Sequence, residues 1–113
     1  MGGLGKVRMT VTTQLVLQLL LDDPAQETYG LAIAEAAGLP SGTIHPILAR
    51  LEQAGWVESH WEQVDPRAEK RPRRRYYRLS ALGAEQARQV LEVAHATRPW
   101  LFTLRPRAVR SAS

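Results

Sequence analysis

The sequence contains no cysteine, so neither a disulfide nor a cysteine-based zinc site can hold this chain of 113 residues together. Phenylalanine occurs once, and no apolar run approaches the roughly 20 residues of a membrane-spanning helix. The apolar stretch 15–21 is too short for such a helix, and no signal-peptide cleavage region follows it. The length predicts one domain, and the absences suit a cytoplasmic protein without a membrane partner.

Groups that carry enzyme chemistry are also scarce. The three histidines, His45, His60 and His95, fall in three different predicted elements, and no Ser/His/Asp arrangement, paired-acid site or HExxH motif is present. Glu58, His60 and Glu62 alternate along a predicted strand and could bind a metal weakly. The same alternation is typical of the solvent side of a hairpin. We therefore expect no enzyme, no metal site and no cofactor.

Positive charge is concentrated in one stretch. The chain carries a net charge of +4, and arginine outnumbers lysine thirteen to two. Residues 65–78 hold seven basic side chains against two acids, so the rest of the chain is close to neutral. A neutral body with one basic segment favours a polyanionic partner. Arginine suits phosphates and guanine edges because its guanidinium donates two parallel hydrogen bonds.

Hydrophobic periodicity and turn residues predict the order of elements. Helices are expected over residues 10–21, 28–37, 41–54 and 80–96, and strands over 56–64 and 76–79. Thr28, Ser41 and Ser80 are the predicted N-caps, while Gly38 and Gly55 close helices. This order predicts a mainly α fold with a small β-hairpin (α+β): a winged helix-turn-helix domain plus a C-terminal dimerisation helix. The expected organisation is a flexible leader 1–8, the winged domain 9–80, the dimerisation helix and apolar patch 81–104, and a disordered tail 105–113.

The helix-turn-helix at residues 28–54 is the most specific signal. Small side chains at Ala34 and Ala37 allow two helices to approach closely, and Gly38 permits a sharp turn. A helix in the second position enters the major groove with its N-terminal residues toward the bases. The predicted DNA contacts from this helix are Ser41, Gly42, Thr43, His45 and Arg50. Ser41 and Thr43 could instead serve only as helix caps.

The segment 65–75 is the predicted wing, a Pro-containing loop that joins the two strands. Its basic residues repel one another, and no nearby acid in the sequence relieves them, so we expect DNA phosphates to do so with release of counterions. Alternation in the returning strand predicts that Tyr77 and Leu79 face the core. The predicted phosphate contacts are Lys70, Arg71, Arg73, Arg74 and Arg75.

The C-terminal part carries more apolar surface than one small domain is expected to cover. The predicted dimerisation residues are Val90, Leu91, Ala94, Trp100, Leu101 and Phe102. Two-fold pairing would cover both groups of residues and place two recognition helices on one face of DNA. The alternative is a monomer in which the last helix packs on residues 15–21. Trp100 is also the predicted stacking residue for a flat ligand.

The runs Gly42–Glu52 (GTIHPILARLE) and Arg74–Gly83 (RRYYRLSALG), with Trp61 between them, resemble the PadR family of bacterial winged-helix transcription regulators. The similarity covers about residues 15–93. It implies a cytoplasmic homodimer that represses nearby promoters and that, in some members, is released by a small aromatic or drug-like ligand. The short C-terminal region resembles the branch with a single dimerisation helix. The family usually has tyrosine where this chain has His45.

A winged-helix module that mediates protein contacts or binds RNA, without promoter regulation, is the rival interpretation. The basic wing does not distinguish double-stranded DNA from structured RNA, because both present phosphates.

Overall fold

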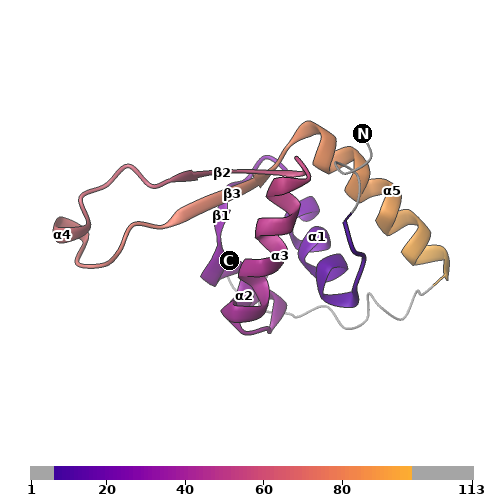
Figure 1. The fold of residues 1–113 in the computed structure, drawn as a ribbon, viewed down its shortest axis with the longest axis horizontal. Coiled ribbons are helices and arrows are strands. Elements are labelled where there is room, and N and C mark those ends of the chain that lie inside the picture. The colour runs from indigo at the N-terminus through magenta and orange to yellow at the C-terminus, as the bar shows by residue number, and fades with distance from the viewer. Residues whose placement is uncertain (1–6, 98–113) are drawn as a thin grey trace.

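The computed structural model describes residues 7–97, and Figure 1 shows how their elements are arranged. In chain order these elements are α1 (Val11–Asp22), β1 (Thr28–Tyr29), α2 (Gly30–Ala37), α3 (Ser41–Gln53), β2 (Val57–Trp61), α4 (Pro66–Glu69), β3 (Arg75–Leu79) and α5 (Ala81–Thr97). The mainly α fold with a small antiparallel sheet confirms the predicted winged-helix architecture. No helix in this described part of the chain is long and apolar enough to cross a membrane.

The sheet has three strands in the order β1-β3-β2, all antiparallel, where the sequence predicted a two-stranded hairpin. The additional strand is β1, which replaces the predicted helix start at Thr28. Thr28 pairs with Tyr77 and Tyr29 pairs with Tyr76. Aromatic packing favours this arrangement, because the Tyr29 and Tyr76 rings meet edge to face with centroids 5.7 Å apart. Thr28 therefore belongs to a strand and is not a helix cap.

The turns of the helix-turn-helix form as the glycines predict. Gly38 adopts a left-handed conformation, with φ of 70°, and its N–H donates to carbonyls at the end of α2. Gly55 follows α3 with φ of 82°. Residues with a side chain are sterically disfavoured in the left-handed conformation, which explains glycine at both helix ends.

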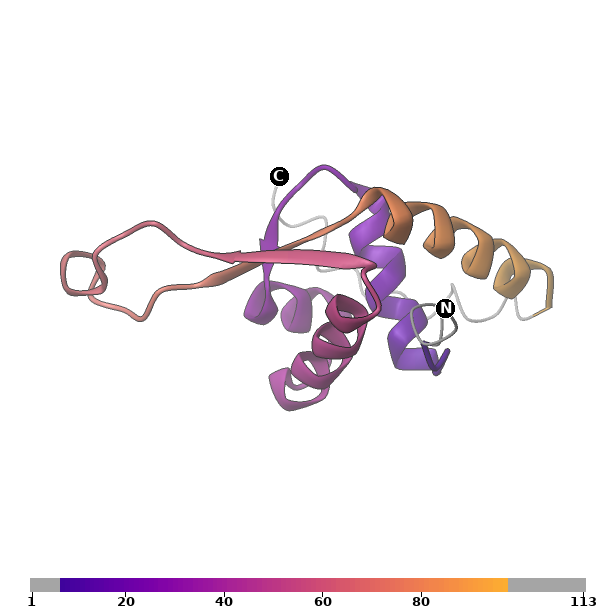
Figure 2. The same cartoon turned by 45° about the horizontal axis from the view of Figure 1, so that its top comes forward.

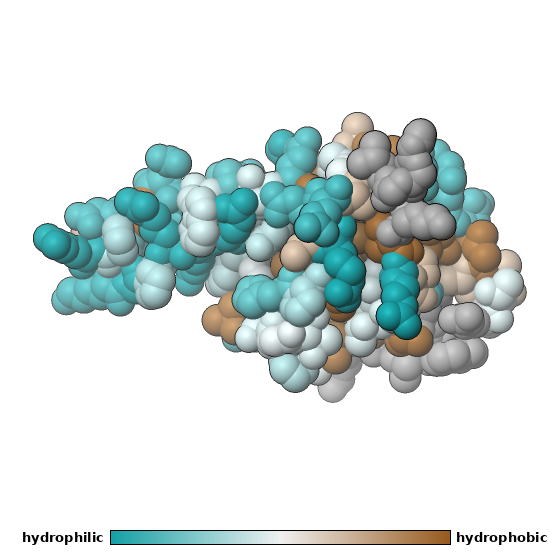
Figure 3. All heavy atoms as spheres, in the orientation of Figure 1, coloured by the Kyte–Doolittle hydropathy of each residue, from teal (hydrophilic) through white to brown (hydrophobic). Residues whose placement is uncertain are grey.

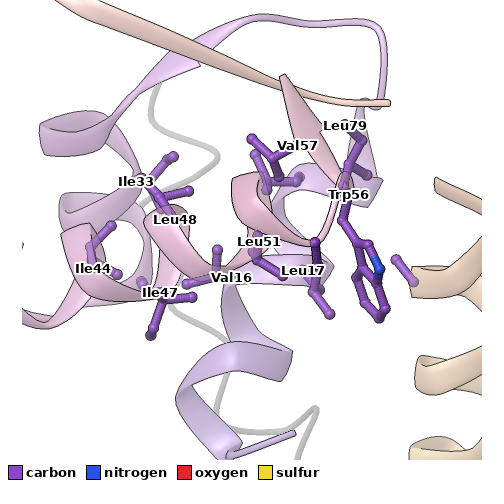
Figure 4. Close-up of a cluster of buried hydrophobic side chains, with 14 of the residues drawn as sticks. Val16, Leu17, Ile33, Ile44, Ile47, Leu48, Leu51, Trp56, Val57 and Leu79 are labelled. Carbon is purple, nitrogen blue, oxygen red and sulfur yellow. The ribbon is translucent and has the colours of Figure 1, made fainter. Parts of the chain in front are cut away.

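One hydrophobic core joins α1, α2, α3 and the base of the sheet (Figure 4). The apolar residues of α3 point into this core, since Ile44, Leu48 and Leu51 are fully buried. Ala34 and Ala37 of α2 are also buried, so small side chains do lie where α2 and α3 meet. This packing fixes the outward face of α3.

A tight joint connects the sheet to α5. The Ser80 hydroxyl accepts a hydrogen bond from the Gly83 N–H at 2.9 Å, which confirms the predicted cap, and donates to the Gly55 carbonyl at 2.6 Å. The Ser80 N–H donates to the Trp56 carbonyl at 2.9 Å. A Cβ on Gly83 would lie 1.8 Å from that same carbonyl oxygen. The first turn of α5 can therefore reach the sheet only with glycine at position 83.

The wing projects away from the helical body in both ribbon views (Figures 1 and 2). It comprises β2, β3 and the segment 62–74 between them. The predicted loop contains one helical turn, α4, at its far end. Asp65 begins that turn by accepting a hydrogen bond from the Arg67 N–H at 2.9 Å, and Lys70 ends it in the left-handed conformation, with φ of 58°. The backbone at the end of the wing is thus folded.

Candidate nucleic-acid interface

The exposed face of α3 presents most of the predicted base contacts. Ser41, Gly42, His45 and Arg50 are exposed, and Thr43 is half-buried. All five belong to the same helix, whose opposite side is held in the core. The N-terminal end of α3 is therefore polar, rigid and accessible.

The predicted cap of α3 is wrong by one residue. Pro40 occupies the N-cap position, and no side chain caps the helix. Proline at this position supplies the extended backbone before the helix and accepts from the Thr43 N–H at 2.9 Å through its carbonyl. The Ser41 hydroxyl consequently has no capping role and is available to a partner.

His45 lies over the start of α2. A Cβ on Gly30 would approach the His45 Cε1 to 2.5 Å, so the absence of a side chain at Gly30 makes room for the imidazole. The ring therefore has a defined position beside the base of the wing. Sequence reasoning placed His45 on the outer face but gave no signal for this contact with α2.

A hollow of about 180 Å³, here called the helix–wing pocket, lies between α3 and the base of the wing. Its lining residues come from β1, α2, α3 and the wing: Tyr29, Gly30, Leu31, His45, Arg74, Arg75 and Tyr77. No acid is among them. The Arg74 guanidinium lies 4.2 Å from the centre of the Tyr29 ring, a cation–π distance. The pocket thus brings two arginines of the wing beside the predicted recognition helix.

Acids relieve part of the charge of the wing, contrary to the expectation from the sequence. Glu62 accepts from both terminal nitrogens of Arg71, at 2.8 and 2.9 Å, and from the Arg74 N–H at 3.1 Å. We call Glu62, Arg71 and the Arg74 amide the wing clamp. Sequence reasoning placed Glu62 on the solvent side of the hairpin, whereas its side chain is only 13% exposed.

The clamp has a clear ionisation state. The hydrogen bond from Arg71 is the main cause that lowers the pKa of Glu62 from its usual value near 4.5 to about 2, and the same bond raises the pKa of Arg71. A carboxylate with a lowered folded-state pKa stabilises the fold above its unfolded pKa. The contribution of the clamp is therefore complete above about pH 4.5 and is lost as the pH falls through about 2.

The other basic side chains of the wing differ in whether an acid lies close enough to neutralise them. Arg75 lies 3.7 Å from Glu52 of α3 and stacks over the Trp61 ring at 5.0 Å. The Arg73 side chain donates to the Val64 carbonyl at 3.0 Å, which leaves its positive charge without an acid. Within residues 7–97, Lys70, Arg73 and Arg74 form no ion pair. Figure 3 shows the projecting wing covered by hydrophilic residues.

The three residues considered for a weak metal site have other partners. His60 contacts Glu27 at 2.7 Å, Glu58 pairs with Arg78 at 3.3 Å, and Glu62 belongs to the clamp. The part of the chain that the structure describes contains no cluster of three metal-binding side chains.

The predicted dimerisation residues lie partly in the core. Leu91 and Ala94 are 3% and 7% exposed because α5 packs along α1, as the monomer alternative supposed. Val90 is half-buried, whereas Val93 is 62% exposed. A groove of about 400 Å³, the α1–α5 groove, is lined by Met9, Gln14, Gln89, Val90, Val93, Ala94 and Thr97. Trp100, Leu101 and Phe102 lie outside the described residues.

A family model described as "Transcriptional regulator PadR-like family" matches residues 16–89, which is more than half of the chain. The chain belongs to the PadR-like family. The match confirms the resemblance of the runs Gly42–Glu52 and Arg74–Gly83. Members of this family are transcriptional regulators and not enzymes, which agrees with the scarcity of catalytic groups in this PadR-like chain.

Solved structures of DNA-bound AbfR and of a PadR family regulator share the fold. Overoxidized AbfR bound to DNA is 30% identical, with a TM-score of 0.63 over 80% of this chain and 61% of AbfR. Reduced AbfR bound to DNA is also 30% identical, with a TM-score of 0.62 over 78% of this chain and 58% of AbfR. This chain therefore spans less than two thirds of AbfR. A PadR family regulator from Eggerthella lenta DSM 2243 is 25% identical, with a TM-score of 0.62 over 83% of each chain. No curated protein sequence matches the chain.

Proposed function

We propose that this PadR-like chain binds double-stranded DNA sequence-specifically and represses transcription as a homodimer on a two-fold symmetric operator. The observation that carries the proposal is the helix–wing pocket, which His45 of α3 and two arginines of the wing line together and which has no acid among its lining residues. AbfR, which is similar in fold, is known in DNA-bound form. Occupation of promoter DNA by such a dimer would block access of RNA polymerase.

The two parts of the interface have different tasks in this proposal. α3 enters the major groove, where Ser41, Gly42, Thr43 and His45 meet base edges and Arg50 meets the backbone. Short polar side chains and an imidazole can bond to bases or pack on a thymine methyl group. The basic residues of the wing that form no ion pair, Lys70, Arg73 and Arg74, meet phosphates and supply affinity that is independent of sequence.

The proposed dimer contact is the α1–α5 groove and the neighbouring face of α5. Val93 is largely exposed there, and the Gln14 Oε1 is buried with no hydrogen-bond partner among the described residues. A buried acceptor without a donor is costly, and a second copy of the chain can supply one. We also propose that a small aromatic effector enters this groove and shifts the dimer away from DNA.

Competition binding tests the proposed function. The full chain is titrated with a duplex from upstream of its own gene, a random duplex and an RNA duplex of equal length. We expect the upstream duplex to bind at least roughly 1,000-fold more tightly than random DNA at physiological salt. Equal affinity for both DNAs would remove the claim of sequence recognition, and a preference for the RNA would favour the rival RNA-binding module.

Changing Thr43 or His45 to alanine should reduce sequence discrimination. Removal of a good base contact narrows the free-energy gap between operator and random duplex by about 1–3 kcal/mol. Equilibrium titration of both duplexes measures the gap. Gln53→Ala, at the exposed C-terminal end of the same helix, is the control and should leave the gap unchanged. Equal weakening on both duplexes would assign the residue to phosphate contact or to support of the helix.

Changing Val93 to glutamate should convert the dimer to a monomer. The side chain is 62% exposed, so the substitution leaves the fold of one chain intact but places a charge in an apolar contact. Sedimentation at micromolar concentration measures the change, and operator affinity should fall with it because two linked sites bind more tightly than one. Leu82→Glu, at the other end of α5, is the control. A wild-type chain that is monomeric yet binds operator tightly would contradict the dimer.

A further inference from the structure

The two arms of the wing continue past the sheet without a regular series of backbone hydrogen bonds between them. Paired residues of β2 and β3 end at Trp61 and Arg75. One more backbone bond joins the arms, from the Glu62 N–H to the Arg74 carbonyl at 2.8 Å. Beyond this bond, backbone hydrogen bonds among the described residues occur only within residues 65–71 at the tip, so side chains hold the two arms together between the sheet and the tip. A wing without such restraints would have to be ordered when it binds a partner, and that ordering lowers affinity.

Glu62 lies in the first arm where the ladder ends, and its carboxylate contacts the returning arm. Its two carboxylate oxygens receive the paired hydrogen bonds of Arg71, and Oε1 also receives the Arg74 N–H. The Tyr76 hydroxyl lies 3.5 Å from Oε2, so it adds a weak contact at most. A carboxylate that receives a guanidinium through two parallel bonds has a defined orientation as well as a charge partner.

We propose that Glu62 is a positioning residue for DNA binding, which holds the returning arm of the wing so that Lys70, Arg73 and Arg74 face the phosphates. Arg71 acts inside this clamp and not on DNA. The inference rests on the proposed DNA-binding function and deepens it. It assigns an acid to the binding machinery of a basic wing.

The proposal and simple electrostatics predict opposite changes in DNA affinity when Glu62 loses its charge. Replacing Glu62 with glutamine removes one negative charge, and a more positive wing attracts DNA more strongly if charge alone decides. It would also free Arg71 to contact a phosphate. If the clamp positions the wing, the same substitution weakens DNA binding, because neutral glutamine cannot receive both guanidinium bonds and the Arg74 N–H.

Glu62→Gln is compared with Glu58→Gln, which removes the same charge from β2. Glu58 is exposed and contacts only Arg78, at 3.3 Å, among the ion pairs of the described residues. We expect Glu62→Gln to weaken operator and random duplex alike by roughly tenfold, the cost of ordering one or two side chains on binding. Glu58→Gln should bind as tightly as the wild type or more tightly.

Salt dependence and a double substitution separate positioning from general damage to the fold. The slope of log affinity against log salt should become shallower by about 0.9 for each phosphate that the Glu62→Gln chain no longer neutralises, although this chain is more positive than the wild type. Arg71→Met should have the same effect, and the combination should be no worse than either change alone. Hydrogen exchange should accelerate at the Arg74 amide while the amides of α3 remain protected.

Tighter binding by Glu62→Gln, or an unchanged salt slope, would overturn the role of Glu62. Additive losses from Glu62→Gln and Arg71→Met would show that Arg71 contacts DNA directly, which would overturn its place in the clamp. A wild-type chain that does not bind duplex DNA would instead remove the proposed function, so the two failures are distinguishable.

Discussion

Replacing Gly83 with alanine should lower the free energy of unfolding by about 3 kcal/mol, at the upper end of the cost of forcing extra atoms into a packed site. For a domain of this size the midpoint of thermal unfolding should fall by roughly 10–20 °C. The added Cβ would lie 1.8 Å from the Trp56 carbonyl oxygen and 2.6 Å from its carbonyl carbon. Both are backbone atoms, so no side-chain rotation can relieve the clash.

The Gly83→Ala substitution should also disturb α5 and the core. To admit the Cβ, the first turn of α5 must move away from the sheet, which breaks the bonds of Ser80 to Gly55 and Trp56. The same movement loosens the packing of Leu91 against α1. Thermal and urea unfolding followed by circular dichroism measure the change in stability.

Gly42→Ala is the matched control, because a Cβ at Gly42 meets nothing within 4 Å. Alanine is the better helix former by about 0.5–1 kcal/mol, so this change should leave stability unchanged or raise it. A Gly83→Ala chain as stable as the wild type would show that α5 does not dock closely on the Trp56 backbone.

Replacing Lys70, Arg73 and Arg74 together with glutamine should produce the largest fall in DNA affinity. These cations form no ion pair among the described residues, so their charges are available to phosphates. If each neutralises one phosphate, the salt slope should become shallower by about 2.7, and affinity near 0.1 M salt should fall by roughly 100-fold or more. Operator and random duplex should be affected alike, because phosphate contacts carry no sequence information.

Arg88→Gln on α5 is the control for this prediction. Arg88 is exposed, contacts Glu85 at 3.6 Å and lies outside the wing, so its replacement should leave the salt slope unchanged. A triple variant with the slope of the wild type would contradict backbone contact by the wing.

The helix-turn-helix is predictable from sequence because local chemistry determines it. The apolar stripe of α3 repeats at helical spacing, and glycine at positions 38 and 55 meets the left-handed conformations found there. Each signal acts within a few residues of its effect. The helix α3 and its exposed face could therefore be predicted correctly, because the signals lie close together in the sequence.

The strand β1 was missed because its two residues are extended only through contact with a distant segment. Thr28 and Tyr29 pair with Tyr77 and Tyr76, and nothing nearby in the sequence distinguishes such a short strand from the start of a helix. Tertiary pairing decided the conformation there. The position of His45 over Gly30 has the same origin, since it depends on how α2 and α3 pack.

The wing clamp was missed for a related reason. Glu62 lies outside the basic run, and only the antiparallel register brings it to Arg71 and Arg74. The register pairs Trp61 with Arg75, and its continuation by one residue places Glu62 beside Arg74. No register was predicted from the sequence. The basic run alone shows the sign of the partner's charge, whereas the fold determines which cations are available to that partner.

A hydroxyl-radical footprint of the full chain on the DNA upstream of its own gene is the most direct test of sequence-specific binding by a dimer. The proposal predicts two symmetry-related protected segments whose centres lie about 10 base pairs apart, or a multiple of this spacing, as two recognition helices in successive major grooves require. Glu62→Gln should retain the positions of the segments at higher protein concentration. Uniform protection along the fragment, or one isolated segment without a symmetric partner, would contradict the account.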